Sequence, residues 1–200
     1  MIRIDLIRHA KTLWNLEKRI QGRTDPVLCP LGIEQAEKWA EMLNHRLYDL
    51  ILSSPMTRAW QTAQIISAGR GICIKSDNGL REQDFGKWEG RRFSDINQET
   101  PGMIQQEEAN GWNFCPPDGE SRIHVLDRSL AAMASAALRF SGSRILVVCH
   151  NSVIKTLVYH ALKRQFLPGE PKILSPYGLH ELAFDTRLSV LNLNCLQLPE

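Results

Sequence analysis

Residues that could bind and transfer a phosphoryl group follow three apolar segments of the chain. Arg8 and His9 come directly after the first segment, His150 follows the longest one, and Arg58 lies just beyond Ser53-Ser54. An arginine guanidinium presents a planar fork that matches phosphate or carboxylate oxygens, and histidine can serve as a base or a nucleophile. If the three segments are neighbours, this chemistry predicts an oxyanion site, with phosphate favoured because so much positive charge converges.

The elements that position these residues follow from apolar periodicity. It predicts strands at 2–7, 49–52, 72–74 and 144–149, and helices at 33–43, 56–67, 121–140 and 152–162. In the first helix, Ile33, Ala36, Ala40 and Leu43 are expected to form the apolar face. Residues 180–198 predict a β-hairpin. The alternation of strands and helices predicts a layered α/β fold with a mostly parallel sheet, in which ligands bind at the carboxyl ends of the strands.

We expect a single domain over 1–200, because no repeat or linker-like tract interrupts the chain. Residues 77–118 are rich in Gly, Pro, Asn and charged residues and are expected to contain short helices, with 91–118 forming a small cap-like insertion. Trp112 and Phe114 could stack on a substrate ring or pack in the core of this insertion, and the second role is favoured.

The composition excludes several classes of protein. The chain is 43% hydrophobic and 23% charged with a formal net charge of +2, so neither a nucleic-acid surface nor a membrane surface is expected. Its cysteines are odd in number and irregularly spaced, which predicts neither a disulfide framework nor a zinc site. No signal-peptide pattern or membrane-spanning apolar run is visible. We therefore expect a cytoplasmic protein.

Other phosphate chemistries lack their motifs. Neither GxxxxGK[ST] nor GxGxxG occurs, and no HExxH or similar cluster predicts a metal. Cys149 could be the nucleophile of a cysteine phosphatase, but the position six residues later is Lys155 rather than an arginine. The remaining histidines do not lie at strand ends with a partner cation, so we expect them to be structural: His45, His124, His160 and His180.

Several short motifs together resemble the histidine phosphatase superfamily, also called the phosphoglycerate mutase-like family. Their order and spacing over most of the chain are more specific than any one of them. In chain order they are Leu6-Ile7-Arg8-His9, Thr12, Asn15, Gln21-Gly22, Asp25, Leu31-Gly32, Gln35-Ala36, Ser53-Ser54-Pro55, Arg58-Ala59, Gln61-Thr62-Ala63, LREQDFGKWEG at 80–90, PPDGES at 116–121 and VVCHNS at 147–152.

The resemblance implies a three-layer α/β/α sandwich and a role for each matching residue. His9 would be the nucleophile that accepts the phosphoryl group, and Glu82 would be the general acid and then the base. Glu82 must then be protonated when it acts as the acid, which burial or the charge of a bound phosphate would favour. The residues implied to bind the phosphate or substrate are Arg8, Asn15, Gln21, Gly22, Arg58, His150 and Asn151. No metal or other cofactor is implied.

The chain departs from the family pattern at four positions. Ala10 replaces a glycine and would be strained only if the backbone there has a positive φ. Asn151 replaces a glycine after the second histidine and is expected to alter the pocket. Asp118 also replaces a glycine, and Cys29 replaces a threonine that caps the next helix, so a weaker cap is expected. No group that performs chemistry is missing.

The motifs at 88–90 and 116–121 resemble the α-ribazole phosphatase and broad-specificity phosphatase branches. The chain is also short for the mutase branch. We therefore expect a phosphatase acting on a small phosphomonoester. Three alternatives stay open: a phosphoglycerate mutase that uses the same phosphohistidine, a phosphatase of phosphohistidine proteins, and a catalytically silent phosphate-binding module, which is disfavoured because every chemical position is filled. The sequence selects neither a physiological substrate nor an oligomeric state.

Overall fold

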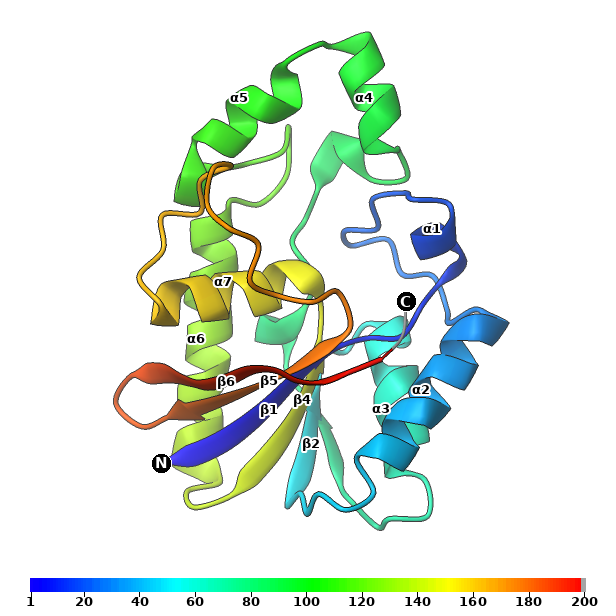
Figure 1. The fold of residues 1–200 in the computed structure, drawn as a ribbon, viewed down its shortest axis with the longest axis vertical. Coiled ribbons are helices and arrows are strands. Elements are labelled where there is room, and N and C mark those ends of the chain that lie inside the picture. The colour runs from blue at the N-terminus through cyan, green and yellow to red at the C-terminus, as the bar shows by residue number, and fades with distance from the viewer. Residues whose placement is uncertain (199–200) are drawn as a thin grey trace.

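The computed structural model describes residues 1–198 and contains a six-stranded sheet in the order β3-β2-β4-β1-β5-β6 (Figure 1). The first four strands in the chain are parallel, and the last two form an antiparallel hairpin beside β1. The last two residues of the predicted 1–200 domain lie outside the described residues. The strands are β1 Ile2–Arg8, β2 Leu50–Ser53, β3 Ile74–Ser76, β4 Arg144–Cys149, β5 Gly178–Phe184 and β6 Leu188–Gln197.

Helices cover both faces of the sheet, with α2 and α3 on one face and α6 and α7 on the other (Figure 1). This arrangement confirms the three-layer α/β/α sandwich with a mostly parallel sheet. The α-helices are α1 Leu13–Leu16, α2 Pro30–Met42, α3 Thr57–Ser67, α4 Phe93–Glu99, α5 Met103–Ala109, α6 Arg122–Arg139 and α7 Asn151–Ala161, and short 3-10 turns lie at Asn78–Leu80, Gly86–Trp88 and Gly111–Asn113.

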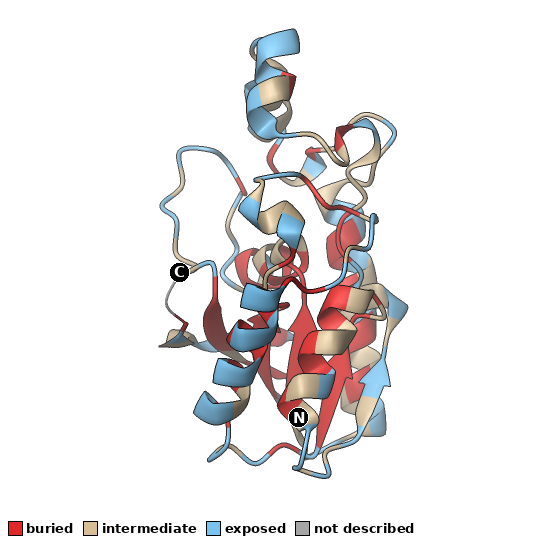
Figure 2. Cartoon of the chain, turned by 90° about the vertical axis from the view of Figure 1, so that its right-hand side faces the viewer, coloured by how far each residue is buried: buried red, intermediate tan, exposed pale blue. Residues whose placement is uncertain are grey.

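The position of strand β4 inside the sheet explains why its sequence is continuously apolar. Successive side chains of a strand point to opposite faces. Ile145 and Val147 therefore join the hydrophobic core beneath α6 and α7, whereas Leu146 and Val148 join the core beneath α2 and α3. Figure 2 shows the buried sheet enclosed by helices whose outer sides are exposed. A strand buried on both faces has no position for a polar residue until it ends.

The structure corrects three local predictions. Ile33 was expected on the apolar face of α2 but is 43% exposed. Gly32 lies so close to the Lys11 carbonyl that a side chain would not fit, which turns this side of the helix inward and Ile33 outward. Strand β3 begins at Ile74 rather than at residue 72, and the stretch expected to be irregular at 8–30 contains α1.

The carboxyl ends of β1, β2 and β4 are adjacent, as the candidate residues require. Arg8 pairs in register with Cys149, and Ser53 pairs with Val148. This edge faces α4 and α5, which form the far end of the molecule in Figure 1. Over residues 1–198, no helix is both long and apolar enough to cross a bilayer.

Candidate active site

A cavity of about 300 Å³ opens where β1 and β4 end. It collects side chains from the β1 end, the loop at 15–22, α3, the loop after Asn78–Leu80, and α7. Every site residue predicted from the sequence lines it except His150, whose ring lies 5.1 Å from that of His9. The predicted residues that line the cavity are Arg8, His9, Asn15, Gln21, Gly22, Arg58, Glu82 and Asn151.

His9 is held as a neutral imidazole with a defined orientation. Its side chain is 1% exposed, and its Nδ1–H donates to the Ala10 carbonyl at 2.7 Å. The opposite nitrogen, Nε2, accepts from Arg58 Nε at 3.2 Å. Burial, followed by the positive charges of Arg58 and Arg8, holds the pKa of His9 well below its ordinary value. Nε2 therefore keeps a lone pair and can act as a nucleophile.

The contacts of His150 fix the tautomer of its ring. Its Nε2 lies 2.8 Å from Ser54 Oγ, which already accepts from the Met56 N–H. The Ser54 hydroxyl can therefore donate to Nε2, which leaves the proton of the neutral ring on Nδ1. That Nδ1 is buried and has no partner within residues 1–198. Burial, and then Arg58 and His9, keep the pKa of His150 well below its ordinary value.

These two histidines predict a loss of stability in acid. Their pKa values in the folded protein lie below the value of about 6.5 expected in the unfolded chain, so the unfolded chain binds more protons below that pH. The free energy of unfolding should be fully maintained above pH 6.5 and should fall below it, by up to about 1.4 kcal/mol per pH unit for each histidine. Urea titrations between pH 5 and 8 measure the slope. A His9→Gln variant should show a shallower one, and an unchanged slope would contradict the burial of a neutral His9.

Arg58 is buried and joins His9 to the loop at 22–25. Its Nη2 donates to the Gly22 carbonyl at 2.9 Å, and its Nη1 donates to the Thr24 carbonyl at 2.8 Å. Burial lowers the pKa of Arg58 to about 10, with Glu82 and Asp25 opposing the shift, so the group is cationic near neutral pH. The Nε of Arg8 is also buried and has no partner in the described part of the chain.

Glu82 faces the cavity with one oxygen already engaged. Its Oε1 accepts from the N–H groups of Gln83 at 2.9 Å and Ser152 at 3.3 Å, whereas Oε2 has no hydrogen-bond partner among residues 1–198. Arg128 fixes the backbone of this loop, since it donates to the carbonyls of Arg81 and Glu82 at 2.6 and 3.2 Å. Sequence reasoning missed this positioning role of Arg128.

Gly22 is required where the loop packs against Glu89. Its φ is +52°, and the Glu89 carboxylate occupies the place of a side chain. That carboxylate accepts from the N–H groups of Arg23 at 2.6 Å and Thr24 at 3.0 Å, which fixes the backbone of this loop. Glu89 therefore explains part of the motif at 88–90. Beside it, Gln21 Oε1 is buried without a partner in residues 1–198.

The side chain of Asn15 both caps helix α1 and lines the cavity. Its Oδ1 accepts from the Thr12 N–H at 3.0 Å and so completes the capping box of α1. The Nδ2 group is left as a donor for a ligand in the cavity that Asn15 lines.

The departures from the family pattern have different consequences. Ala10 has no positive φ, so its methyl is unstrained and packs in a small cluster with Leu28 and Ala36. Asp118 does adopt a left-handed φ of +59° and pairs with Lys87 on the surface. Cys29 begins α2 without a side-chain cap, as expected, and its Sγ instead contacts the Lys11 carbonyl at 3.5 Å.

Ala10→Gly is therefore expected to destabilise the protein although it restores the commoner residue. The variant loses one buried methyl group and loosens a backbone that has no need of glycine, at a combined cost of about 1–2 kcal/mol. Urea unfolding at pH 7.5 measures this change. Equal or higher stability of the variant would show that the backbone at this position favours glycine.

Phe114 packs in the core of the insertion, as favoured from the sequence, whereas Trp112 is half-buried and packs against the main core beneath α6 and α7. Trp112 Nε1–H donates to the Arg164 carbonyl at 2.8 Å, and its ring packs edge-on against Phe166. Phe114 is 4% exposed and packs edge-on against Trp88. One side of Phe114 also reaches the cavity.

Sequence reasoning missed about half of the cavity wall. Lys155 had a detectable signal, since it lies four residues after Asn151 on α7 and thus on the same helix face. Arg122 had none, because its approach depends on contacts with distant segments. The other lining residues that sequence reasoning missed are Arg19, Ile20, Gln83, Phe85, Phe93, Glu108, Ser152 and Phe166.

The described residues provide neither a metal site nor a reactive thiol at Cys149. Among the described residues, no group of three or more His, Cys, Asp or Glu side chains is placed to hold a metal ion. Cys149 is fully buried, and burial raises the pKa of its thiol far above the ordinary value. A thiol in this state is a poor nucleophile.

A sheet edge that gathers two histidines, two guanidinium groups and a carboxyl is a candidate site for phosphoryl transfer. The sequence model of the histidine phosphatase superfamily (branch 1) matches residues 4–193, and the chain belongs to this family. A probable phosphoglycerate mutase, GpmB of Salmonella arizonae, is 36% identical over 158 residues, which cover 79% of this chain and 74% of that protein.

Solved structures agree with this assignment. The mycobacterial glucosyl-3-phosphoglycerate phosphatase superposes with a TM-score of 0.86 at 27% identity, over 96% of this chain and 98% of the other. The α-ribazole phosphatase of Shigella flexneri superposes with a TM-score of 0.77 at 25% identity, over 96% of each chain. The chain is therefore an enzyme of the phosphomonoesterase type, with both phosphatases and mutase-like proteins among its relatives.

Proposed function

We propose that the chain is a phosphatase that hydrolyses a small phosphomonoester through a covalent phosphohistidine on His9. The observation that carries this proposal is the state of the His9 ring. Its Nδ1–H is fixed on the Ala10 carbonyl, and its unprotonated Nε2 lies beside the guanidinium of Arg58. A nucleophile with a fixed tautomer, adjacent to a cation, suits attack on phosphorus.

In the first step, the Arg58 Nε–H exchanges its hydrogen bond to His9 Nε2 for one to a phosphate oxygen. The Nε2 lone pair then forms a bond to phosphorus while the ester P–O bond breaks. The leaving oxygen takes the proton of Glu82 Oε2 and departs as an alcohol. Negative charge on the three remaining oxygens is stabilised by Arg8, Arg58 and the Nδ1–H of His150. Asn15 and Gln21 would supply amide donors, and Asn151 and the Gly22 loop would contact the substrate.

In the second step, Glu82 returns as a base. Its carboxylate accepts a proton from water, the water oxygen bonds to phosphorus, and the bond from phosphorus to His9 Nε2 breaks. Inorganic phosphate leaves, and both residues regain their starting protonation. No metal, nucleotide or other cofactor takes part, and the partner is a small phosphorylated molecule rather than a nucleic acid or a membrane. The cytoplasmic location stays a prediction.

The segment 91–118 is proposed to act as a cap over the cavity. It contains α4 and α5, which lie beyond the sheet edge in Figure 1. Phe93, Glu108 and Phe114 of this segment reach the cavity lining. Water must reach the phosphoenzyme for hydrolysis to occur. A cap as small as this one therefore favours a phosphatase over a mutase.

The alternative is a phosphoglycerate mutase, which the similarity to GpmB favours. The two functions are separated by incubating the enzyme in EDTA, either with 3-phosphoglycerate and a bisphosphorylated primer or with an aryl phosphate. We expect free phosphate from the aryl phosphate, no loss of rate in EDTA, and inhibition by vanadate. Net formation of 2-phosphoglycerate without free phosphate would overturn the phosphatase proposal.

Glu82→Gln should slow the enzyme in a way that depends on the leaving group. An alkoxide needs a proton as it leaves, whereas p-nitrophenolate does not, so kcat/KM should fall by about 10²–10⁴-fold for an alkyl phosphate and much less for p-nitrophenyl phosphate. Steady-state kinetics on both substrates measure the difference. Equal losses on the two substrates would remove Glu82 from the role of general acid.

A further inference from the structure

The cavity holds more positive charge than a single phosphate requires. Beyond Arg8 and Arg58, it is lined by Lys155 and Arg122, with Glu108 as the one acidic side chain besides Glu82 in this lining. Arg19 also lines the cavity, but its Nε is paired with Glu17 at 2.6 Å. Lys155 and Arg122 are therefore the two remaining cations of the cavity lining, and neither is assigned to binding the transferred phosphoryl group.

Lys155 projects into the cavity without a partner. Its Nζ makes no ion pair or hydrogen bond with any residue in the range 1–198. Burial, and then the charges of Arg122 and Arg8, lower the pKa of Lys155 from its ordinary value, while Glu108 and Glu82 oppose the shift. A half-buried ammonium group beside other cations is unfavourable in the empty site, and an anionic ligand relieves this repulsion.

Arg122, which lines the same cavity as Lys155, is held rigidly. The guanidinium carbon lies 4.1 Å from the ring centroid of Phe114 and 4.1 Å from that of Phe166. Its Nη1 donates to the Gly111 carbonyl at 3.0 Å, while Nε and Nη2 donate to no residue within 1–198. A cation stacked between two aromatic rings is fixed before a ligand arrives, so little ordering entropy is lost on binding.

Lys155 lies on the same cavity wall as residues of the candidate phosphate site. His150 caps α7, and Asn151 and Lys155 both line the cavity one helical turn apart, which corresponds to a rise of about 6 Å. A second cavity of about 260 Å³ also includes Arg8, Asn151 and Lys155, so these three side chains stand between two hollows. An anion bound to Lys155 would therefore share this cavity with a phosphoryl group on His9.

We infer that Lys155 and Arg122 form a second anion subsite that selects phosphomonoesters carrying a further anionic group, a carboxylate or a second phosphate, a few bonds from the scissile phosphate. This inference rests on the proposed function for its catalytic consequence, but binding at the subsite does not depend on turnover. It favours small acidic phosphoesters over neutral ones such as nucleoside-like monoesters.

The test compares 3-phosphoglycerate with glycerol 3-phosphate, which differ only in a carboxylate against a hydroxymethyl group. Calorimetry on the His9→Ala protein should show at least tenfold tighter binding of 3-phosphoglycerate. Adding Lys155→Met should reduce this preference about tenfold or more, while Lys155→Arg should retain most of it. Glycerol 1,3-bisphosphate shows whether a second phosphate replaces the carboxylate.

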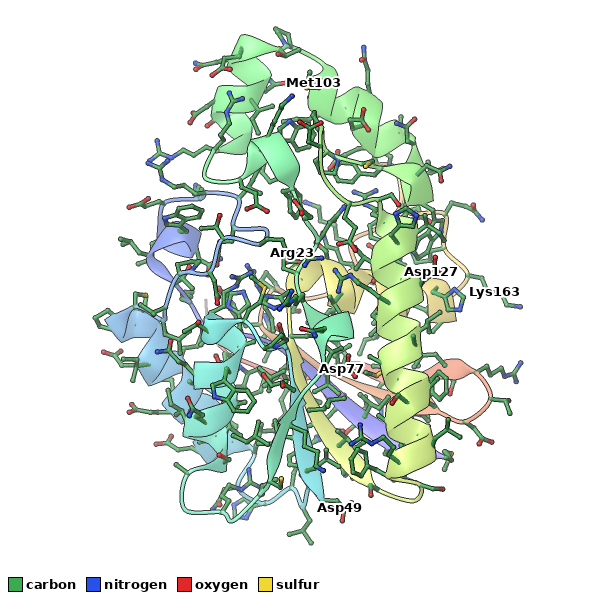
Figure 3. All side chains as sticks on the ribbon, turned by 180° about the vertical axis from the view of Figure 1, so that it is seen from behind. Arg23, Asp49, Asp77, Met103, Asp127 and Lys163 are labelled. Atoms are coloured by element: carbon green, nitrogen blue, oxygen red, sulfur yellow. The ribbon has the colours of Figure 1, made fainter. Side chains whose placement is uncertain are left out.

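Lys163→Met is the matched control, because Lys163 is exposed just beyond the end of α7 and does not line the cavity. Figure 3 shows Lys163 at the outer edge of the molecule. It should keep the full preference. Equal affinity for the two ligands, or a preference that survives Lys155→Met, would overturn the subsite. Failure of the proposed function is separate, because it would appear as absence of phosphate release from every substrate even where the ligands bind with the expected preference.

Discussion

His9→Ala is expected to lower kcat for phosphomonoester hydrolysis by about 10⁴-fold or more, the range seen when a catalytic nucleophile is removed. The ring is the group in the cavity whose Nε2 is unprotonated, buried and in contact with a guanidinium. Removing it leaves the cationic pocket in place, so ligand binding should persist while turnover is lost. Steady-state kinetics together with calorimetry on the same protein measure both properties.

His160→Ala is the matched control for this substitution. His160 is exposed near the end of α7 and does not line the cavity, so its loss should leave kcat within about twofold, as is usual for surface positions. Retention of full activity by His9→Ala, with His160→Ala equally active, would place the nucleophile on another residue.

Arg58→Met is expected to have the second largest effect, a fall in kcat/KM of about 10³-fold. The guanidinium donates to His9 Nε2 and to the carbonyls of Gly22 and Thr24, so it orients the nucleophile and holds the loop that closes the site. Leaving these carbonyls without donors should also destabilise the fold by about 1–3 kcal/mol.

Arg58→Lys separates charge from geometry. A lysine keeps a cation but cannot bridge His9 and two carbonyls, so we expect only partial recovery of kcat/KM. Arg70→Met is the control, since Arg70 donates to the Arg46 carbonyl at 2.6 Å and does not line the cavity. If Arg70→Met lowered kcat/KM as much as Arg58→Met, the kinetic loss would reflect general destabilisation rather than the site.

The catalytic edge could be predicted from the sequence because its signals are local. An apolar segment that stops at a polar residue marks a strand end, and three such segments ended in Arg8-His9, Ser53 and His150. Their adjacency follows from the way parallel strands assemble. The error at Ile33 had a non-local cause, namely the close approach of Gly32 to the Lys11 carbonyl.

The other half of the cavity could not be predicted in the same way. Glu82 lies in a loop without periodicity, so only the resemblance to a family pointed to it. The roles of Arg128 and Arg122 depend on contacts with residues more than ten positions away in the chain, such as the carbonyls of Glu82 and Gly111. Lys155 alone could have been placed, by following the helical period from Asn151.

Detection of the phosphohistidine is the most direct test of the mechanism. The enzyme is mixed rapidly with a ³²P-labelled substrate and quenched, and the labelled protein is digested and sequenced by mass spectrometry. We predict an acid-labile, alkali-stable phosphoryl group on His9 Nε2 that disappears at the rate of phosphate release and is absent from His9→Ala. Active enzyme that carries no label during turnover, or a label on another residue, would contradict the central role of His9.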